Sequence, residues 1–314
     1  MRTAIPFVAQ LSEAEEKAWL QVLRTALSEH DIVRLDALTA AQREAAKVAI
    51  VANPAPTQLA AFPNLLWVQS LWAGVERLLV KTQEADFAIV RMTDPQLANT
   101  MAEAVLAWTL YLHRDMPRYR AQQLTQQWQQ HPLPLPSERN IGLLGLGHLG
   151  KSAAQTLVHH GFTVYGWSRS QTAVDGVETL CGDRGLADVL RQSHILICLL
   201  PSTRKTCGLL NHQTLALLPP DAALINFARG SILDTDALLD HLNNGHLSHA
   251  VLDVFDEEPL PPQSPLWSHA NITVLPHIAA PTHKQTASLI VANNIRQFLT
   301  QGKIPASVDR TLGY

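Results

Sequence analysis

The sequence has no excess of charge of one sign. Its 24 Lys and Arg residues against 27 Asp and Glu residues give a formal net charge of −3, and no block of basic residues occurs along the chain. The sequence therefore lacks the basic surface that is typical of proteins that bind nucleic acid or an anionic membrane. Any attraction for a charged ligand must therefore come from a few side chains at one place.

Cysteine and long apolar runs are also scarce. The three cysteines, Cys181, Cys198 and Cys207, show no C-x-x-C spacing, so we expect buried reduced thiols rather than disulfides. His246 and His249 straddle a turn into a strand, and we expect no metal site there. No segment reaches the roughly 18 to 20 apolar residues of a membrane span, and the apolar run at the N-terminus is too short for a signal peptide. The sequence therefore predicts a cytoplasmic protein without membrane contact.

The length and the alternation of elements predict two α/β domains. In the first hundred residues we expect strands at 3–9, 48–52, 65–71 and 87–91, a helix from the Ser12/Glu15 capping box to about residue 30, and a helix at 99–112. From residue 140 onward we expect strands at 140–144, 162–167, 194–200, 222–226, 248–254 and 271–275, with helices at 151–160, after Asp234 and at 284–300. The predicted fold is two doubly wound parallel-sheet (Rossmann-like) domains. Residues 1–98 with 285–314 would form a discontinuous substrate-binding domain, and residues 99–284 a dinucleotide-binding domain.

A segment rich in Gln and Pro, at 118–136, follows the helix at 99–112. Its composition is that of a linker, whereas its aromatic residue Trp128 favours an arm that docks on another surface.

A glycine hexad, Gly145-Leu146-Gly147-His148-Leu149-Gly150, separates the strand at 140–144 from the next helix. In a dinucleotide-binding βαβ unit the first Gly permits the tight turn. The second lets backbone N–H groups approach the pyrophosphate, and the third lets the helix pack on the strand. The helix N-terminus adds a positive field. We therefore predict a dinucleotide site at this turn.

The residues after the second strand of this unit indicate which dinucleotide binds. An acidic residue that would hold a ribose 2′-OH is absent, and Arg169 stands in its place between Ser168 and Ser170. This predicts that NADPH is preferred, while NADH can also serve. The Tyr-x-x-x-Lys pair of short-chain dehydrogenases occurs at none of the four tyrosines.

Three polar residues follow predicted strands, at the sheet edge where ligands bind in open α/β folds. Arg229 can clamp a substrate carboxylate and polarise a carbonyl. His277 can donate a proton, and a nearby carboxylate such as Glu258 favours the charged imidazolium. Together the three suit hydride addition to a 2-keto acid.

These residues lie within motifs that resemble the D-2-hydroxyacid dehydrogenase family over about residues 140–281. The motifs occur in the family's order: the glycine hexad, Leu200-Pro201-Ser202-Thr203, Ala228-Arg229-Gly230, Leu252-Asp253-Val254-Phe255 with Glu258-Pro259, and Pro276-His277-Ile278-Ala279-Ala280. Within the family, the closer likeness is to glyoxylate/hydroxypyruvate reductase of the A type. It is carried by Leu71-Trp72-Ala73-Gly74-Val75, Gly166-Trp167-Ser168-Arg169-Ser170 and Pro259-Leu260-Pro261-Pro262.

The resemblance implies a role for each matching residue. Arg229 would bind the keto acid, His277 would be the acid/base and Glu258 its hydrogen-bonded partner. The substrate carboxylate would also meet the turn formed by Trp72, Ala73, Gly74 and Val75. The residues implied in cofactor binding are Gly145, Gly147, His148, Leu149, Gly150, Ser168, Arg169, Ser170, Leu200, Pro201, Thr206, Phe227, Ala228, Arg229, Asp253, His277 and Ala279. Family members are dimers, and the arm around Trp128 suits that role.

The implied activity is NADPH-dependent reduction of glyoxylate to glycolate and of hydroxypyruvate to D-glycerate. One alternative is a reductase of another, bulkier 2-keto acid. Trp72 and Trp267 could narrow the pocket against such a substrate or could simply be packing residues. The other alternative is a non-catalytic NAD(P)-sensing protein on the same fold. The three filled catalytic positions argue against it, because a sensor needs no proton donor.

Overall fold

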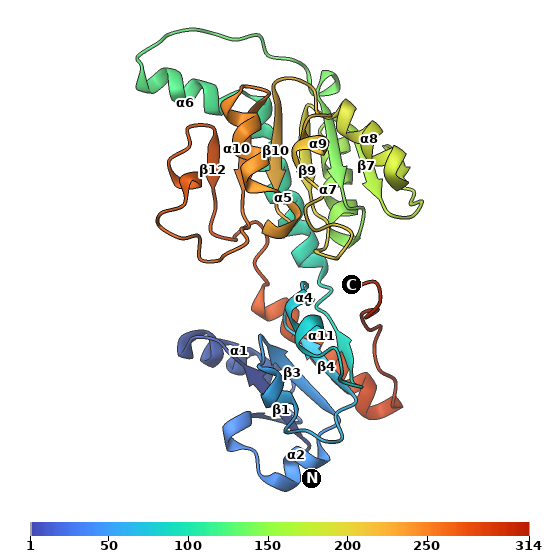
Figure 1. Cartoon of the computed structure of the whole chain (residues 1–314). Helices are drawn as coiled ribbons and strands as arrows, with labels where there is room; N and C mark the ends of the chain where they lie inside the picture. The colour runs from blue at the N-terminus through green and yellow to red at the C-terminus, as the bar shows by residue number, and fades with distance from the viewer. Residues whose placement is uncertain (1, 314) are drawn as a thin grey trace. The chain divides into compact units, whose positions relative to one another are not determined.

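A computed structural model describes residues 2–313 of the chain. It contains two compact units, one formed by the residues up to Gln96 together with those from Thr282 onward, and the other by Leu97–Pro281. The polypeptide thus leaves the smaller unit once and returns to it for its last helix (Figure 1).

The smaller unit is built on a five-stranded parallel sheet of order β2-β1-β3-β4-β5. Its strands are β1 (Ala4–Ala9), β2 (Asp31–Arg34), β3 (Val48–Ala52), β4 (Trp67–Ser70) and β5 (Ala88–Val90). Its helices are α1 (Glu13–Ala26), α2 (Ala40–Ala45), α3 (Pro56–Leu59), α4 (Glu76–Lys81) and α11 (Lys284–Gln301). Apolar residues of α1 and α11 share one buried cluster with the sheet, and those of α3 and α4 lie in a cluster on the other face. Both faces are therefore covered, which explains why β3 is buried at every position.

The larger unit is built on a seven-stranded parallel sheet of order β12-β11-β10-β9-β6-β7-β8. Its strands are β6 (Asn140–Leu144), β7 (Thr163–Ser168), β8 (Val177–Cys181), β9 (Ile195–Cys198), β10 (Ala222–Asn226), β11 (Leu247–Leu252) and β12 (Ile272–Val274). Its helices are α6 (Met116–Leu124), α7 (His148–His159), α8 (Gly182–Gln192), α9 (His212–Leu215) and α10 (Thr235–Asn243), and α5 (Pro95–His113) leads into it.

Helices cover both faces of this sheet as well (Figure 1). Apolar residues of α5 and α7 pack on one face, and those of α8, α9 and α10 pack on the other. The strand order reverses between β6 and β9, because the chain runs outward through β7 and β8 and then crosses to the opposite side. Such a reversal is where ligands bind in doubly wound sheets. The predicted fold class, with two parallel sheets and flanking helices, is confirmed.

Several predicted elements need correction. Strands β2 and β8 were not expected, and the first helix ends at Ala26 rather than near residue 30. The helix after the glycine hexad begins at His148 rather than at residue 151, and part of the Gln-rich segment is helical in α6. Both missed strands lie at sheet edges, where short, partly polar sequences suffice.

The cysteines also differ from expectation. Cys198 is buried in β9, and burial raises the pKa of its thiol to about 12. Cys181 is only partly buried and Cys207 is exposed, so the prediction that all three thiols are buried is wrong.

Candidate active site

The turn after β6 has a geometry that requires glycine at two positions. Gly145 has a φ of +105°, and a Cβ there would lie 2.9 Å from the carbonyl oxygen of Leu199. A Cβ on Gly150 would lie 1.7 Å from the carbonyl oxygen of Gly145. The absence of a side chain at Gly145 therefore permits the sharp turn, and its absence at Gly150 lets α7 start close to the strand.

Helix α7 starts within this turn. Gly147 occupies its N-cap position, and a Cβ on that residue would meet no atom within 4 Å, so the backbone there borders open space. The first helical bond runs from the Lys151 N–H to the Gly147 carbonyl, at 2.9 Å, which leaves the N–H groups of His148, Leu149 and Gly150 without partners in the helix. These donors and the helix dipole fit a dinucleotide pyrophosphate.

The turn after β7 lies directly beside the glycine turn. The Gly145 N–H donates to the Trp167 carbonyl at 2.8 Å, and the Ser168 hydroxyl donates to the Ser170 carbonyl at 2.7 Å. Arg169 is exposed on this turn. A guanidinium and two serines are a donor set suited to a phosphate rather than to a ribose hydroxyl pair.

His277 and Glu258 form the central pair of the site. Nδ1 of His277 lies 2.8 Å from Oε2 of Glu258, and the other carboxylate oxygen accepts the Phe255 N–H at 3.0 Å. Since a carboxylate accepts, Nδ1 carries a proton in this arrangement, and Nε2 is the nitrogen that can exchange a proton with a ligand. The pair is thus oriented for acid/base chemistry at Nε2.

Asp253 fixes the loop that carries His277. Its two oxygens accept the N–H groups of Ile278, at 2.7 Å, and Ala279, at 2.9 Å. Its side chain is buried, and burial raises the pKa of this carboxyl although the two hydrogen bonds act in the opposite direction. Asp253 therefore joins the loops after β11 and β12 and holds His277 in its unusual backbone conformation, with φ at +56°.

Arg229 lies at the end of the neighbouring strand β10. Asn226 holds its loop, because the amide nitrogen donates to the Arg229 carbonyl at 3.1 Å and the amide oxygen accepts the Ala228 N–H at 3.2 Å. A Cβ on Gly230 would lie 2.1 Å from the carbonyl carbon of Phe255, so this loop packs on the backbone of the loop that bears Glu258.

Strands β10, β11 and β12 are adjacent and parallel, and their following loops carry Arg229, Glu258 and His277 in turn. The structure thus brings the three predicted catalytic residues to one edge of one sheet. Of the two residues that position these loops, Asp253 was predicted as a cofactor-binding residue and Asn226 was not predicted. A buried Asn at the end of an apolar strand was a usable signal for Asn226.

The remaining predicted cofactor residues also lie in the loops of this edge. The Thr206 hydroxyl donates to the Pro201 carbonyl at 2.6 Å, which closes the turn after β9. Phe227, Ala228 and Ala279 are buried in the core clusters, so only their backbone groups can meet a ligand.

The predicted substrate turn, residues 72–75, belongs to the smaller unit. The Trp72 N–H is held by the Ser70 hydroxyl at 3.0 Å, and its indole nitrogen donates to Asn53 at 3.1 Å. Within the part of the chain that the structure describes, the N–H groups of Ala73, Gly74 and Val75 make no hydrogen bond. They are available as donors to an anion.

Other candidates do not assemble into sites. His246 bonds to the Leu215 carbonyl and His249 to Thr273, so the two rings have different partners. Burial lowers the pKa of His249 to about 4. Among residues 2–313, no group of three or more His, Cys, Asp or Glu side chains is arranged to hold a metal, and no helix is long and apolar enough to cross a membrane.

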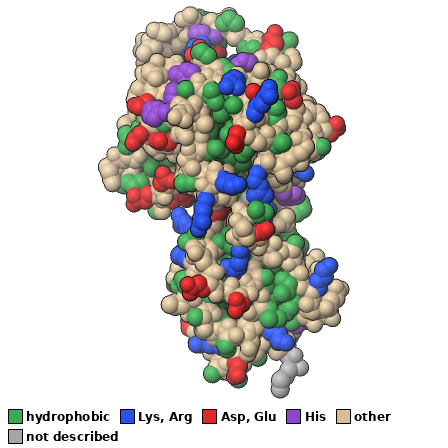
Figure 2. Space-filling model, turned by 45° about the vertical axis from the view of Figure 1, so that its right-hand side comes forward, with side chains coloured by type: hydrophobic (Ala, Val, Ile, Leu, Met, Phe, Trp, Pro, Cys, Tyr) green, Lys and Arg blue, Asp and Glu red, His purple; other side chains and the backbone are tan. Residues whose placement is uncertain are grey.

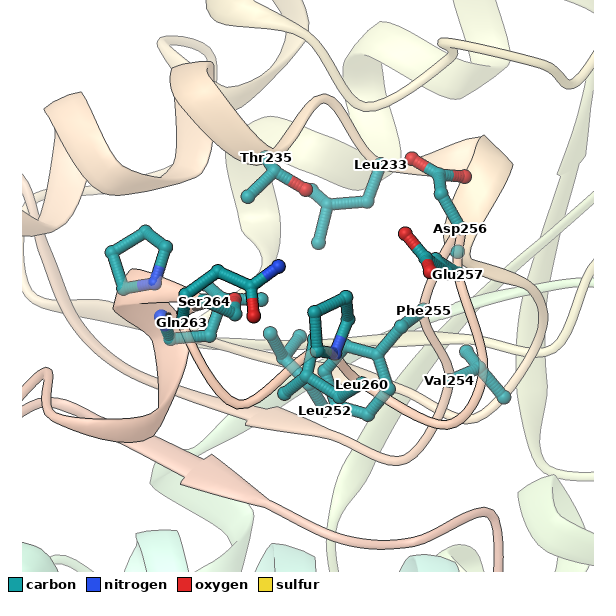
Figure 3. A pocket seen from close by; sticks show the side chains of 14 residues that line it. Leu233, Thr235, Leu252, Val254, Phe255, Asp256, Glu257, Leu260, Gln263 and Ser264 are labelled. Atoms are coloured by element: carbon teal, nitrogen blue, oxygen red, sulfur yellow. Dashed lines mark hydrogen bonds between the residues drawn. The ribbon is translucent and has the colours of Figure 1, made fainter.

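A cavity of about 310 Å³ lies beside the candidate site but is separate from it. Figure 3 shows Leu233, Leu252 and Leu260 lining it, with Asp256 and Glu257 at one side and Gln263 at the other. None of the three predicted catalytic residues lines this cavity.

Known proteins share this architecture over the full chain. Residues 106–279 match the family described as D-isomer specific 2-hydroxyacid dehydrogenase, NAD binding domain. A D-isomer specific 2-hydroxyacid dehydrogenase of Xanthobacter autotrophicus Py2, solved with NADPH and MES, is 35% identical, with a TM-score of 0.92 and 100% of both chains covered. The NADPH-dependent glyoxylate/hydroxypyruvate reductase SmGhrA of Sinorhizobium meliloti, solved with NADP and sulfate, is 30% identical, with a TM-score of 0.91 and 100% of both chains covered. A probable 2-hydroxyacid dehydrogenase of Rhizobium etli CFN 42, solved with NADP, HEPES and L(+)-tartaric acid, is 29% identical, with a TM-score of 0.90 and the same coverage.

Proposed function

Because the chain belongs to the D-isomer specific 2-hydroxyacid dehydrogenase family, we propose that it is an NADPH-dependent reductase of small 2-keto acids. The proposed reactions convert glyoxylate to glycolate and hydroxypyruvate to D-glycerate. The observation that carries the proposal is the 2.8 Å pair of His277 and Glu258, on loops adjoining the one that bears Arg229. The full-length similarity to SmGhrA, whose name states this activity, supports the substrate class.

The proposed chemistry assigns one task to each residue. The guanidinium of Arg229 binds the substrate carboxylate and polarises the keto oxygen. Bound NADPH supplies the hydride that reduces the carbonyl carbon. Nε2 of His277 gives its proton to the developing alkoxide, which yields the 2-hydroxy acid and a neutral imidazole whose Nδ1–H stays on Glu258. Glu258 thereby keeps the ring oriented and stabilises its charged form before transfer.

The glycine turn and the turn after β7 support the cofactor assignment. We assign the pyrophosphate to the backbone N–H groups in the first turn of α7. We assign the 2′-phosphate to Arg169 with Ser168 and Ser170. NADPH is then the preferred reductant and NADH the weaker one. Residues 97–281 would be the dinucleotide-binding domain, and the smaller unit would be the substrate-binding domain.

Steady-state kinetics test the proposed activity. Glyoxylate and hydroxypyruvate, each supplied with NADPH, should show the highest kcat/KM, with pyruvate and an aromatic 2-keto acid well below them and NADH less effective throughout. Oxidation of NADPH is followed by its absorbance. Faster reduction of the aromatic acid would identify the bulkier-substrate alternative, and nucleotide binding without turnover of any keto acid would identify a sensor.

We also propose that the enzyme is a homodimer whose subunits contact each other through the Gln- and Pro-rich segment at 118–136. Trp128 is 97% exposed, and Leu124, Leu133 and Leu135 are more than half exposed, which is unusual for apolar side chains so close in sequence. Sedimentation should give a dimer, and the Trp128→Ser variant should shift the equilibrium toward monomer. A monomeric wild type would contradict this proposal.

A further inference from the structure

Two exposed cations, Arg204 and Lys205, lie on the turn after β9 and have no role in the function proposed above. The Thr206 N–H donates to the Thr203 carbonyl at 3.1 Å, which makes residues 203–206 a β-turn with Arg204 and Lys205 at its tip. The Thr206 hydroxyl also accepts the Thr203 N–H at 2.8 Å. The two cations are therefore presented by a turn that is held in shape by its own hydrogen bonds.

This turn and the turn of Arg169 lie on opposite sides of the glycine turn. The Leu199 N–H donates to the Leu144 carbonyl and the Gly145 N–H donates to the Trp167 carbonyl, both at 2.8 Å. Strand β6 thus separates the ends of β9 and β7, which are two strand spacings, roughly 10 Å, apart. Long side chains from both turns can reach an anion held between them.

The charges on this turn differ from their surroundings. Arg204 and Lys205 form no ion pair with any residue that the structure describes, whereas Arg184 and Arg191 of the same unit both pair with Asp188. Figure 2 shows acidic and basic side chains scattered singly or in small groups over the larger unit. Two adjacent unpaired cations at the ligand-binding edge are therefore a local feature in a chain whose net charge is −3.

A phosphate monoester carries a charge of about −1.5 to −2 at neutral pH. Arg169 is the one cation among residues 169–172, which follow β7, so it cannot balance this charge alone. We propose that Arg204 and Lys205 add positive charge to that of Arg169 at the cofactor 2′-phosphate and so help to select NADP over NAD. This inference rests on the proposed NADPH preference and deepens it by adding a second strand-end turn to the site.

Nucleotide binding, measured by calorimetry without substrate, tests the inference. The R204Q/K205Q double variant should bind NADP⁺ and 2′,5′-ADP about tenfold more weakly, because hydrogen bonds to a charged group are lost. Its affinities for NAD⁺ and ADP, which lack the 2′-phosphate, should stay within about twofold of wild type. The single variants R204Q and K205Q show how much of the loss in affinity for NADP⁺ each side chain accounts for.

Two further variants separate the possible failures. R191Q removes an exposed cation elsewhere on the unit and should leave every affinity unchanged, while R169D should abolish the preference for NADP⁺. Suppose that R169D abolishes the preference for NADP⁺. If R204Q/K205Q then leaves the affinity for NADP⁺ unchanged, or lowers the affinities for NADP⁺ and NAD⁺ equally, the inference is overturned while the proposed function stands. If the wild type itself binds NAD⁺ as tightly as NADP⁺, the proposed cofactor preference fails first, and this inference fails with it.

Discussion

Replacing His277 with Asn is expected to lower kcat for glyoxylate reduction by about 10²- to 10⁴-fold. The substitution removes the ring nitrogen that donates the proton, while Asp253 continues to hold the loop through the N–H groups of Ile278 and Ala279. The site therefore loses its acid but keeps its shape. Stopped-flow measurement of a single turnover reads this step directly, separately from product release.

The control for this variant is nucleotide affinity. NADPH should bind H277N nearly as tightly as wild type, because the glycine turn and the turn after β7 are unaffected. E258Q should have a smaller effect than H277N, because it keeps the proton donor and weakens only the orientation of the ring and the stabilisation of its charged form. A near-normal kcat for H277N would remove His277 from the mechanism.

Replacing Arg229 with Gln is expected to lower kcat/KM for keto acids by about two to three orders of magnitude. Truncating one partner of a buried, hydrogen-bonded charge pair costs about 2 to 5 kcal/mol, and here the unpaired charge would be the substrate carboxylate. Initial rates over a range of glyoxylate concentrations measure the loss. Most of it should appear in KM if the guanidinium mainly binds the carboxylate, and in kcat as well if it also polarises the carbonyl.

R229K provides the matched comparison. Lysine keeps the charge but lacks the planar pair of donors, so an intermediate kcat/KM is expected. Oxamate, a carboxylate that resembles the keto acid, should bind R229Q more weakly than wild type. Equal oxamate binding by the two proteins would contradict the assignment of Arg229 as the carboxylate clamp.

Sequence patterns were sufficient to predict the elements with a strong hydrophobic pattern. Strands β6 and β10 are mostly apolar and mostly buried, and their predicted bounds match the structure. Asp234 caps α10 as expected, because its side chain accepts the Ala237 N–H at 3.0 Å. Edge strand β8 could not be recognised in this way, since its residues Val177–Cys181 are mostly half-buried and include a Glu and a Thr.

The candidate site shows a similar limit. Residue types and motif order identified Arg229, Glu258 and His277, and the structure brings them to one sheet edge. The resemblance implied the hydrogen bond between Glu258 and His277. The other contacts between these loops could not be foreseen, because they depend on three-dimensional register. Asp253 was expected among the cofactor-binding residues on resemblance alone, and the structure adds that its oxygens accept backbone N–H groups of the His277 loop. The close approach of Gly230 to Phe255 likewise has no signature in local sequence.

The ties among these three loops bear on how the enzyme can change over time. Gly230 leaves no room for a side chain against the Glu258 loop, and Asp253 joins that loop to His277, so a substitution in one loop displaces the others. Effects of paired substitutions here should be non-additive. Adaptation to a new keto acid would therefore meet strong epistasis in these loops and would proceed more readily through residues outside them.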